Sequence, residues 1–222
     1  MRLGLAVPLF NEAPLVEAVT RDLVAALEGI DFTLALVDNG STDGTGELVD
    51  RMAGERVLAV HLRDNRGYGG GILAGLEALG EADVLGWAWG DGQVDPSVIP
   101  CLLAAIEGGA VLAKARRTRR QDGWRRRVLT TAYAGVMRLA GVSTPDVNGC
   151  PKLLRRDAFD ALHLRATDWF LDAEAVLGAE ARGWPIANEP VVMRSRPAGH
   201  SKVRAATVLE FAGHLVGRSA RP

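Results

Sequence analysis

Two short apolar runs near the start of the chain each lead into polar residues, and this arrangement limits the possible folds most strongly. Residues 3–7 form the first run and residues 34–37 the second, with apolar residues at helical spacing over 13–27 between them. Such a strand–helix–strand unit gives parallel strands whose carboxyl ends share one edge of the sheet, where ligands of open α/β sheets bind. We therefore expect a nucleotide pocket built from the residues that follow the two runs: Phe10, Glu12, Asp38 and Asn39.

The alternation of expected strands and helices continues along the first half of the chain. Apolar spacing predicts a helix over 48–52 and a strand over 57–62. The glycines at 67–71 are expected to break the chain before a helix over 72–79, and a strand over 84–89 follows. Repeated strand–helix units predict an α/β fold with a mostly parallel, doubly wound sheet flanked by helices.

The second half is less regular but fits a single domain over 1–222. Asp95 and Pro96 are typical of a helix start, as N-cap and first helical residue. Further elements are expected as helices over 98–106, 128–139 and 173–181, and as strands over 110–115, 152–154 and 187–193. We divide the chain into a nucleotide-binding half (1–115), an acceptor and catalytic half (116–202) and a C-terminal amphipathic helix (203–222). For this helix, packing on the core is favoured over membrane docking.

Composition excludes some classes of protein. A net charge of -1 argues against general nucleic-acid binding, which requires an excess of Lys and Arg. Two cysteines are too few for a disulfide framework or a Cys-based zinc site. Neither a secretory signal nor an apolar run long enough to span a bilayer is recognisable. We expect a cytoplasmic protein, either soluble or peripheral at the inner membrane face.

Basic residues are concentrated between Lys114 and Arg127, where Asp122 is the single acid. Two interpretations remain open for this basic loop. It is either a solvated loop, or a segment that attracts diphosphate groups or makes peripheral contact with an anionic membrane surface.

Possible metal ligands follow the strand expected over 84–89. Asp91 and Gln93 can both present an oxygen to one hard cation, Mg²⁺ or Mn²⁺, which completes its shell with substrate phosphate oxygens. The alternative is a turn in which Asp91 bonds local backbone amides. Surface or packing roles are the default for the histidines, which lack metal-ligand spacing: His61, His163, His200 and His214. His200, beside Ser201 and Lys202, is the one histidine that could belong to the site.

Seven motifs follow one another along nearly the whole chain, at 7–12, 37–45, 65–71, 91–96, 152–157, 172–174 and 199–202. In this order they resemble the family 2 glycosyltransferases of the GT-A fold, and within them the dolichol-phosphate mannose synthase-like, polyprenyl-phosphate glycosyltransferase branch. The resemblance implies transfer of a sugar from a nucleotide-diphosphate sugar, with inversion, and a polyprenyl phosphate as first-choice acceptor. Transfer to a soluble small-molecule hydroxyl remains an alternative, as does a non-catalytic nucleotide-sugar-binding protein.

The resemblance also implies roles for individual residues. Contacts to the nucleotide-sugar are implied for Pro8, Phe10, Glu12, Asp38, Asn39, Asp91, Arg116, Ser201 and Lys202. Asp91 and Gln93 would hold the metal, and Lys202 would help to stabilise the charge of the leaving group. Asp172 or Glu174 would act as a base or bind the acceptor. A phosphate acceptor needs no base, because it is already ionised at neutral pH.

Two departures from the family pattern concern the metal and the nucleotide, and two more, at residues 148–152 and Thr131, fall on the acceptor side. Trp89 stands where the metal motif usually begins with an Asp, which leaves open a weaker metal site or a metal-free mechanism. Asn39 replaces the second acid of an Asp-Asp-Gly-Ser motif. Its amide both donates and accepts hydrogen bonds, so the preference for the nucleotide base could differ.

Overall fold

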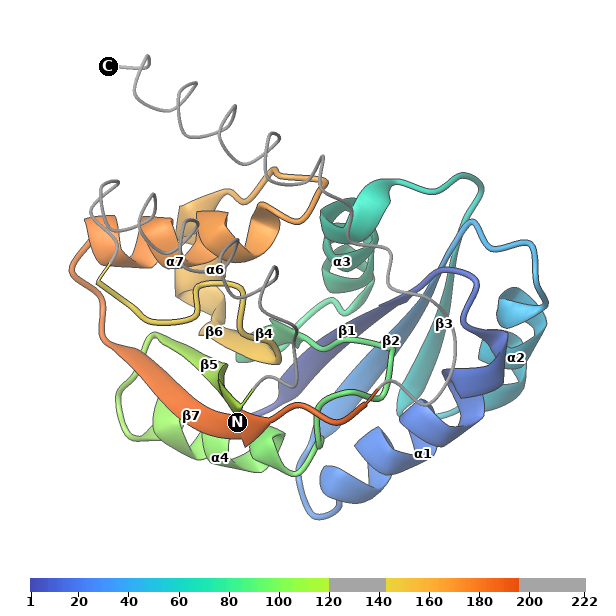
Figure 1. Ribbon diagram of the computed structural model, residues 1–222, viewed down its shortest axis with the longest axis horizontal. Helices are drawn as coiled ribbons and strands as arrows, with labels where there is room; N and C mark the ends of the chain where they lie inside the picture. Colours follow the sequence, from blue (N-terminus) through green and yellow to red (C-terminus); the bar gives the residue numbers. More distant parts are fainter. Residues whose placement is uncertain (120–142, 196–222) are drawn as a thin grey trace.

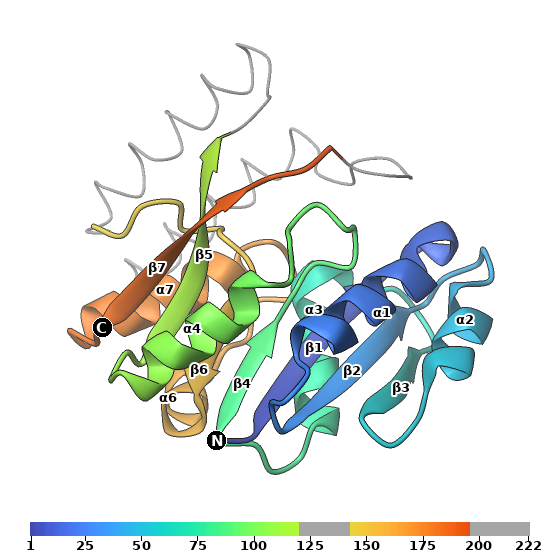
Figure 2. The same ribbon diagram turned by 90° about the horizontal axis from the view of Figure 1, so that it is seen from below.

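The computed structural model describes residues 1–119 and 143–195, which form a seven-stranded sheet with helices on both faces (Figure 1, Figure 2). The strands are β1 (Leu3–Leu9), β2 (Phe32–Asn39), β3 (Val57–Leu62), β4 (Val84–Trp87), β5 (Leu112–Arg119), β6 (Lys152–Arg155) and β7 (Ile186–Val192). The helices are η1 (Ala13–Leu15, a 3-10 turn), α1 (Val16–Ala26), α2 (Thr45–Met52), α3 (Gly67–Ala78), α4 (Val98–Glu107), α6 (Arg156–Leu162) and α7 (Leu171–Ala181). The expected α/β class is confirmed.

The strands lie in the order β3-β2-β1-β4-β6-β5-β7. All neighbours pair in parallel except β6, which is antiparallel to both β4 and β5. Parallel strands need helical crossovers, and these crossovers cover both faces of the sheet, so β1 and β2 are buried along almost their whole length. The mostly parallel sheet predicted from the repeated strand–helix units is thus observed.

Two apolar clusters fill the spaces between the sheet and its helices. Helices α1, α2 and α4 cover one face, and α3, α6 and α7 cover the other (Figure 1). The first cluster includes Leu23, Val49 and Ile99, and the second includes Ile72 and Val176. Within the described ranges, none of the helices combines the length and apolar character that a membrane crossing requires.

The glycine-rich segment 67–71 begins helix α3, so the expected break before residue 72 is wrong. A Cβ added to Gly71 would lie 2.9 Å from Asn39 Nδ2, and one added to Gly75 would lie 2.8 Å from the Cβ of Ala6. Both distances are too short for a real side chain, so glycine allows the helix to approach the sheet closely. Glycine disfavours an isolated helix, but here packing against the sheet outweighs that preference.

Several element boundaries also differ from the sequence-based expectation. Strand β5 continues to Arg119 instead of ending at residue 115, and β4 already ends at Trp87. Asp95 is not the N-cap, because α4 begins at Val98 after a turn in which Asp95 Oδ1 accepts a hydrogen bond from the Ser97 amide at 3.0 Å. The helices expected over 128–139 and 203–222 lie outside the described residues.

Candidate active site

The carboxyl ends of β1 and β2 lie side by side, with Leu9 as the register partner of Asp38. Four hydrogen bonds join the segments that follow these strands: Asn11 N to Ser41 Oγ (3.0 Å), Thr42 N to Asn11 Oδ1 (2.8 Å), Glu12 N to Thr45 Oγ1 (3.0 Å) and Ala13 N to Asp43 Oδ2 (3.1 Å). These bonds fix the first loop against the second. One edge of the sheet therefore holds the residues expected there: Pro8, Phe10, Glu12, Asp38 and Asn39.

Asp38 is buried at this edge and is contacted on both carboxylate oxygens. Its Oδ1 accepts a hydrogen bond from the Ser41 amide at 3.0 Å, and its Oδ2 lies 3.5 Å from Nδ1 of His61. The other imidazole nitrogen of His61 lies 2.8 Å from Asp50 Oδ1. The hydrogen bond to Asp50 raises the pKa of His61 against the opposing effect of burial, and Asp38 adds to the rise. Sequence reasoning gave His61 only a surface or packing role.

The side-chain amide of Asn39 forms hydrogen bonds to the start of α3 through both its nitrogen and its oxygen. Nδ2 donates to the Gly67 carbonyl at 2.9 Å, and Oδ1 accepts from the Arg66 amide at 3.0 Å. A carboxylate at this position could accept from the amide but could not donate to the carbonyl. The structure thus gives a local reason for an amide at position 39, which joins the end of β2 to the start of α3.

The loop after β4 carries Asp91 and Gln93 and is fastened to the segment that follows β7. Asp91 Oδ1 accepts a hydrogen bond from the Gln93 amide at 3.1 Å, which is the local turn considered as the alternative to a metal site. Gln93 Nε2 donates to the Arg194 carbonyl at 3.2 Å, and the Arg194 amide donates to the Gln93 carbonyl at 2.8 Å. Arg194 also forms an ion pair with Asp95.

The donor atoms of this loop fit a hard cation that takes few protein ligands. Asp91 supplies one carboxylate, and the Gln93 amide oxygen is a second oxygen donor on the same loop. Mg²⁺ is commonly bound by one or two carboxylates plus substrate phosphates, so a single carboxylate is a small but sufficient set. No group of three His, Cys, Asp or Glu side chains in the part of the chain that the structure describes could hold a metal by itself.

Trp89 belongs to an aromatic group next to this loop. Its indole Nε1 donates to the hydroxyl of Tyr68 at 2.9 Å, and the ring of Tyr68 stacks on Trp169 with centroids 4.1 Å apart. The Arg117 guanidinium lies 5.6 Å from the centre of the Trp89 ring, within the range of a cation–π contact. An indole N–H can only donate, so Trp89 provides no metal ligand and instead connects the loop to Tyr68.

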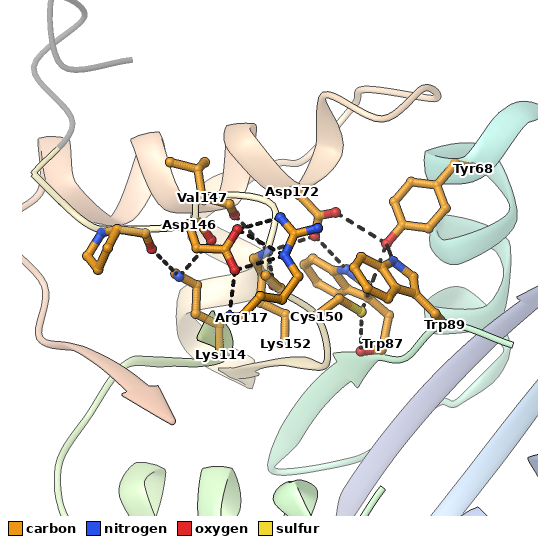
Figure 3. A network of polar contacts seen from close by, with 12 residues as sticks. Tyr68, Trp87, Trp89, Lys114, Arg117, Asp146, Val147, Cys150, Lys152 and Asp172 are labelled. Carbon is orange, nitrogen blue, oxygen red and sulfur yellow. Dashed lines mark hydrogen bonds and ion pairs between the residues drawn. The ribbon is translucent and has the colours of Figure 1, made fainter. Parts of the chain in front are cut away.

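Asp172 lies at the centre of a buried polar network that includes Tyr68 and Trp87 (Figure 3). Its Oδ1 accepts from Lys152 Nζ at 2.7 Å and from Trp87 Nε1 at 3.0 Å, and its Oδ2 accepts from the Tyr68 hydroxyl at 3.2 Å. Burial and the nearby Asp172 carboxylate raise the pKa of Tyr68 well above its usual value, so the phenol keeps its proton and donates. The Asp172 side chain is 1% exposed.

Glu174, the other acid proposed from the sequence, holds the loop before α7. Its Oε2 accepts hydrogen bonds from the amides of Arg165 at 3.0 Å and Ala166 at 2.9 Å. Glu174 thereby connects the loop before α7 to the first turn of that helix. Although only one residue separates Glu174 from Asp172, the two acids make different contacts.

Two buried lysines shape the loop that precedes β6. Lys114 donates to the carbonyls of residues 145 and 146 at 2.7 and 2.9 Å, and Lys152 donates to those of residues 147 and 149 at 3.1 and 2.7 Å. Burial, together with the charge of Lys152, lowers the pKa of Lys114 from 10.5 to about 7. The expected basic loop is therefore wrong at its beginning: Lys114 is fully buried, because β5 continues through this region.

Arg117 and Arg116 differ in their surroundings at the end of β5. Arg117 is mostly buried and forms an ion pair with Asp146, whereas Arg116 is exposed. Burial alone would raise the pKa of Asp146, but the hydrogen bonds and charge of Arg117 outweigh it and lower the pKa. Sequence reasoning chose Arg116 as the site residue and did not single out Arg117. Thr131, His200, Ser201, Lys202 and residues 120–127 of the basic loop lie outside the described residues.

Comparison with known proteins gives a family match over most of the chain. Residues 5–162 match the family model described as Glycosyl transferase family 2. Polyprenol monophosphomannose synthase of Mycolicibacterium smegmatis is 30% identical over 197 residues, covering 80% of this chain and 72% of the relative. Undecaprenyl-phosphate 4-deoxy-4-formamido-L-arabinose transferase of Pseudomonas aeruginosa is 34% identical over 72% of this chain, which spans only 48% of that relative.

Solved structures share the fold at lower sequence identity. Glucosyl-3-phosphoglycerate synthase from Mycobacterium tuberculosis, in complex with Mn²⁺, UDP and glucosyl-3-phosphoglycerate, superposes with a TM-score of 0.75 and 19% identity, covering 100% of this chain and 81% of that one. Mannosyl-3-phosphoglycerate synthase from Rubrobacter xylanophilus gives a TM-score of 0.72 at 17% identity, covering 99% and 74%. The family match, the fold and the sequence relatives together lead to one conclusion: the chain belongs to glycosyl transferase family 2 and has the GT-A fold.

Proposed function

We propose that this chain transfers a sugar, with inversion, from a nucleotide-diphosphate sugar to a polyprenyl phosphate. The names of two relatives support the acceptor class, since one is a polyprenol monophosphomannose synthase and another an undecaprenyl-phosphate 4-deoxy-4-formamido-L-arabinose transferase. Within this chain, the observation that carries the proposal is the set of contacts made by Asp172.

An acceptor hydroxyl must lose its proton, usually to a nearby carboxylate, whereas a phosphate acceptor is already ionised at neutral pH. Asp172 is almost inaccessible, both its oxygens accept hydrogen bonds, and the Lys152 ammonium lies against it. Glu174 is engaged by two loop amides. Neither acid is presented as a base in this arrangement. The arrangement therefore favours an acceptor that supplies its own negative oxygen, and it gives Asp172 a positioning role.

The remaining roles follow from the edge of the sheet described above. The nucleotide would lie against Pro8, Phe10, Glu12, Asp38 and Asn39. Asp91 and Gln93 would hold Mg²⁺ or Mn²⁺, which when bound neutralises charge on the diphosphate. Arg116, Ser201 and Lys202 would contact the phosphates, and positive charge there stabilises the leaving group.

The test compares two acceptors that share one lipid chain. Purified protein is incubated with Mg²⁺ or Mn²⁺, a panel of labelled nucleotide-diphosphate sugars, and either undecaprenyl phosphate or undecaprenol in detergent. Sugar is expected to appear only on the phosphate, through a phosphodiester linkage that mild acid cleaves. Asp91→Asn serves as the inactive control. Transfer to the alcohol but not to the phosphate would contradict the proposal and would require a base that these contacts do not provide.

A further inference from the structure

The carboxylate of Asp38 is enclosed by three neighbouring elements. The Ser41 amide bonds Oδ1 from the following loop, and His61 of β3 faces Oδ2 as the register partner of Asp38 in the sheet. On the third side, a Cβ added to Gly46 of α2 would lie 2.8 Å from Oδ2. The hydrogen bond from the Ser41 amide is the contact that an Asp side chain commonly makes in a turn, and it would be sufficient for that purpose. The two further contacts fix the direction of the carboxylate at the edge where the nucleotide would bind.

His61 joins Asp38 to a second carboxylate. Its Nδ1 faces Asp38 and its Nε2 lies 2.8 Å from Asp50 of α2, so both ring nitrogens face acceptors. Only the protonated imidazole has a hydrogen on each nitrogen and can donate to both. Helix α3 also packs on β3, but its single charged residue, Glu77, lies at the far end of the helix.

We propose that His61 is a positioning residue for Asp38 and makes binding of the nucleotide portion of the donor depend on the protonation of its imidazole. This inference rests on the proposed function, because it takes Asp38 as a nucleotide contact. When the imidazole loses a proton, the shorter contact with Asp50 retains the remaining hydrogen. Oδ2 of Asp38 then faces a nitrogen lone pair, and its carboxylate loses the contact that fixes it.

The experiment measures the dissociation constants of UDP-glucose and GDP-mannose by calorimetry at constant Mg²⁺ between about pH 6 and about pH 9, a range that extends above the ordinary histidine pKa of about 6.5 because the pKa of His61 is raised. Neither ligand has a phosphate that titrates there. For the wild type, affinity for the preferred donor is expected to fall about fivefold as the pH rises, the size of one partly exposed ionic contact. Asp50→Asn should move this fall to lower pH, because Asp50 is the main cause of the raised pKa of His61.

His61→Gln, which is neutral at every pH, is expected to bind weakly and without this pH dependence. His163→Asn is the matched control: it removes a histidine that lies after α6, in a left-handed position that asparagine tolerates, and it should bind as the wild type does. Melting temperatures of all variants monitor folding separately. A His61→Gln profile that matches the wild type at every pH would overturn the assignment of His61. Failure of the wild type to bind these two donors and every other member of the nucleotide-diphosphate sugar panel would instead overturn the proposed function, and the assignment with it.

Discussion

Replacement of Asp172 by asparagine separates a positioning role from a role as base. The substitution keeps the size of the side chain but removes the charge that faces Lys152, whose side chain is fully buried. Removal of one partner from a buried ion pair costs about 3–5 kcal/mol, because the remaining charge stays in a poorly solvated position. The free energy of unfolding of a single domain is about 5–15 kcal/mol, so the expected loss is a large fraction of the stability.

Urea unfolding followed by tryptophan fluorescence measures this loss. With a slope of about 2 kcal/mol per molar urea, the midpoint of Asp172→Asn should fall by roughly 2 M. Asp157→Asn is the matched control, because it breaks an exposed ion pair with Arg155 and should change stability by less than about 1 kcal/mol. The double variant Lys152→Gln/Asp172→Asn should regain part of the loss, since no unpaired charge remains.

Activity measured where Asp172→Asn is folded completes the test. A positioning role predicts that turnover on undecaprenyl phosphate falls by no more than about tenfold, whereas loss of a general base typically costs about 100- to 10,000-fold. An Asp172→Asn variant that is as stable as the wild type but has lost turnover more than about 100-fold would refute the reasoning from burial and contacts.

Three further predictions concern the metal loop and the network beside it. Asp91→Asn should lower turnover at least about 100-fold and remove metal-dependent nucleotide binding, as measured by thermal shift with and without chelator, while the melting temperature without ligand stays unchanged. Trp89→Phe removes the donor to the Tyr68 hydroxyl and should lower the urea unfolding free energy by about 1–2 kcal/mol; no change would mean that water replaces the indole. For Lys114, the folded pKa of about 7 lies below the ordinary 10.5, so between these values the unfolded chain holds a proton that the native chain lacks. Its contribution to the unfolding free energy should therefore rise with pH above about 7, and Lys114→Met should remove this rise in urea midpoints measured up to about pH 9.5.

The sequence predicted the parts of the fold that depend on local pattern. Alternating apolar runs and helical spacing identified β1 to β4 and the helices between them, and polar residues after the strands indicated the edge where a ligand would bind. The shared edge of Asp38 and Glu12 could be predicted in this way, because parallel strands bring their carboxyl ends together regardless of the intervening sequence.

Features that depend on tertiary contacts were not visible in the sequence. Lys114 begins a run of basic residues that was interpreted either as a solvated loop or as an anion-attracting segment, yet its ammonium group is buried and donates to two backbone carbonyls. Asp172 was expected to act as a base or to bind the acceptor, but its ion pair with Lys152 joins two different elements, and no periodicity in the sequence indicates such a contact. The position of His61 in the sequence indicates only that it lacks the spacing of a metal ligand. It does not indicate that the pairing of β2 with β3 places Asp38 beside the imidazole ring.

The path of the loop before β6 is determined mainly by side chains of the neighbouring strands rather than by its own side chains. Four of its carbonyls are bonded by ammonium groups on β5 and β6, and its Asp146 by Arg117 of β5. A loop whose course is dictated by the underlying strands can exchange its own outward side chains without refolding. Lys114, Lys152 and Arg117 are accordingly the residues to keep in any library that diversifies this loop.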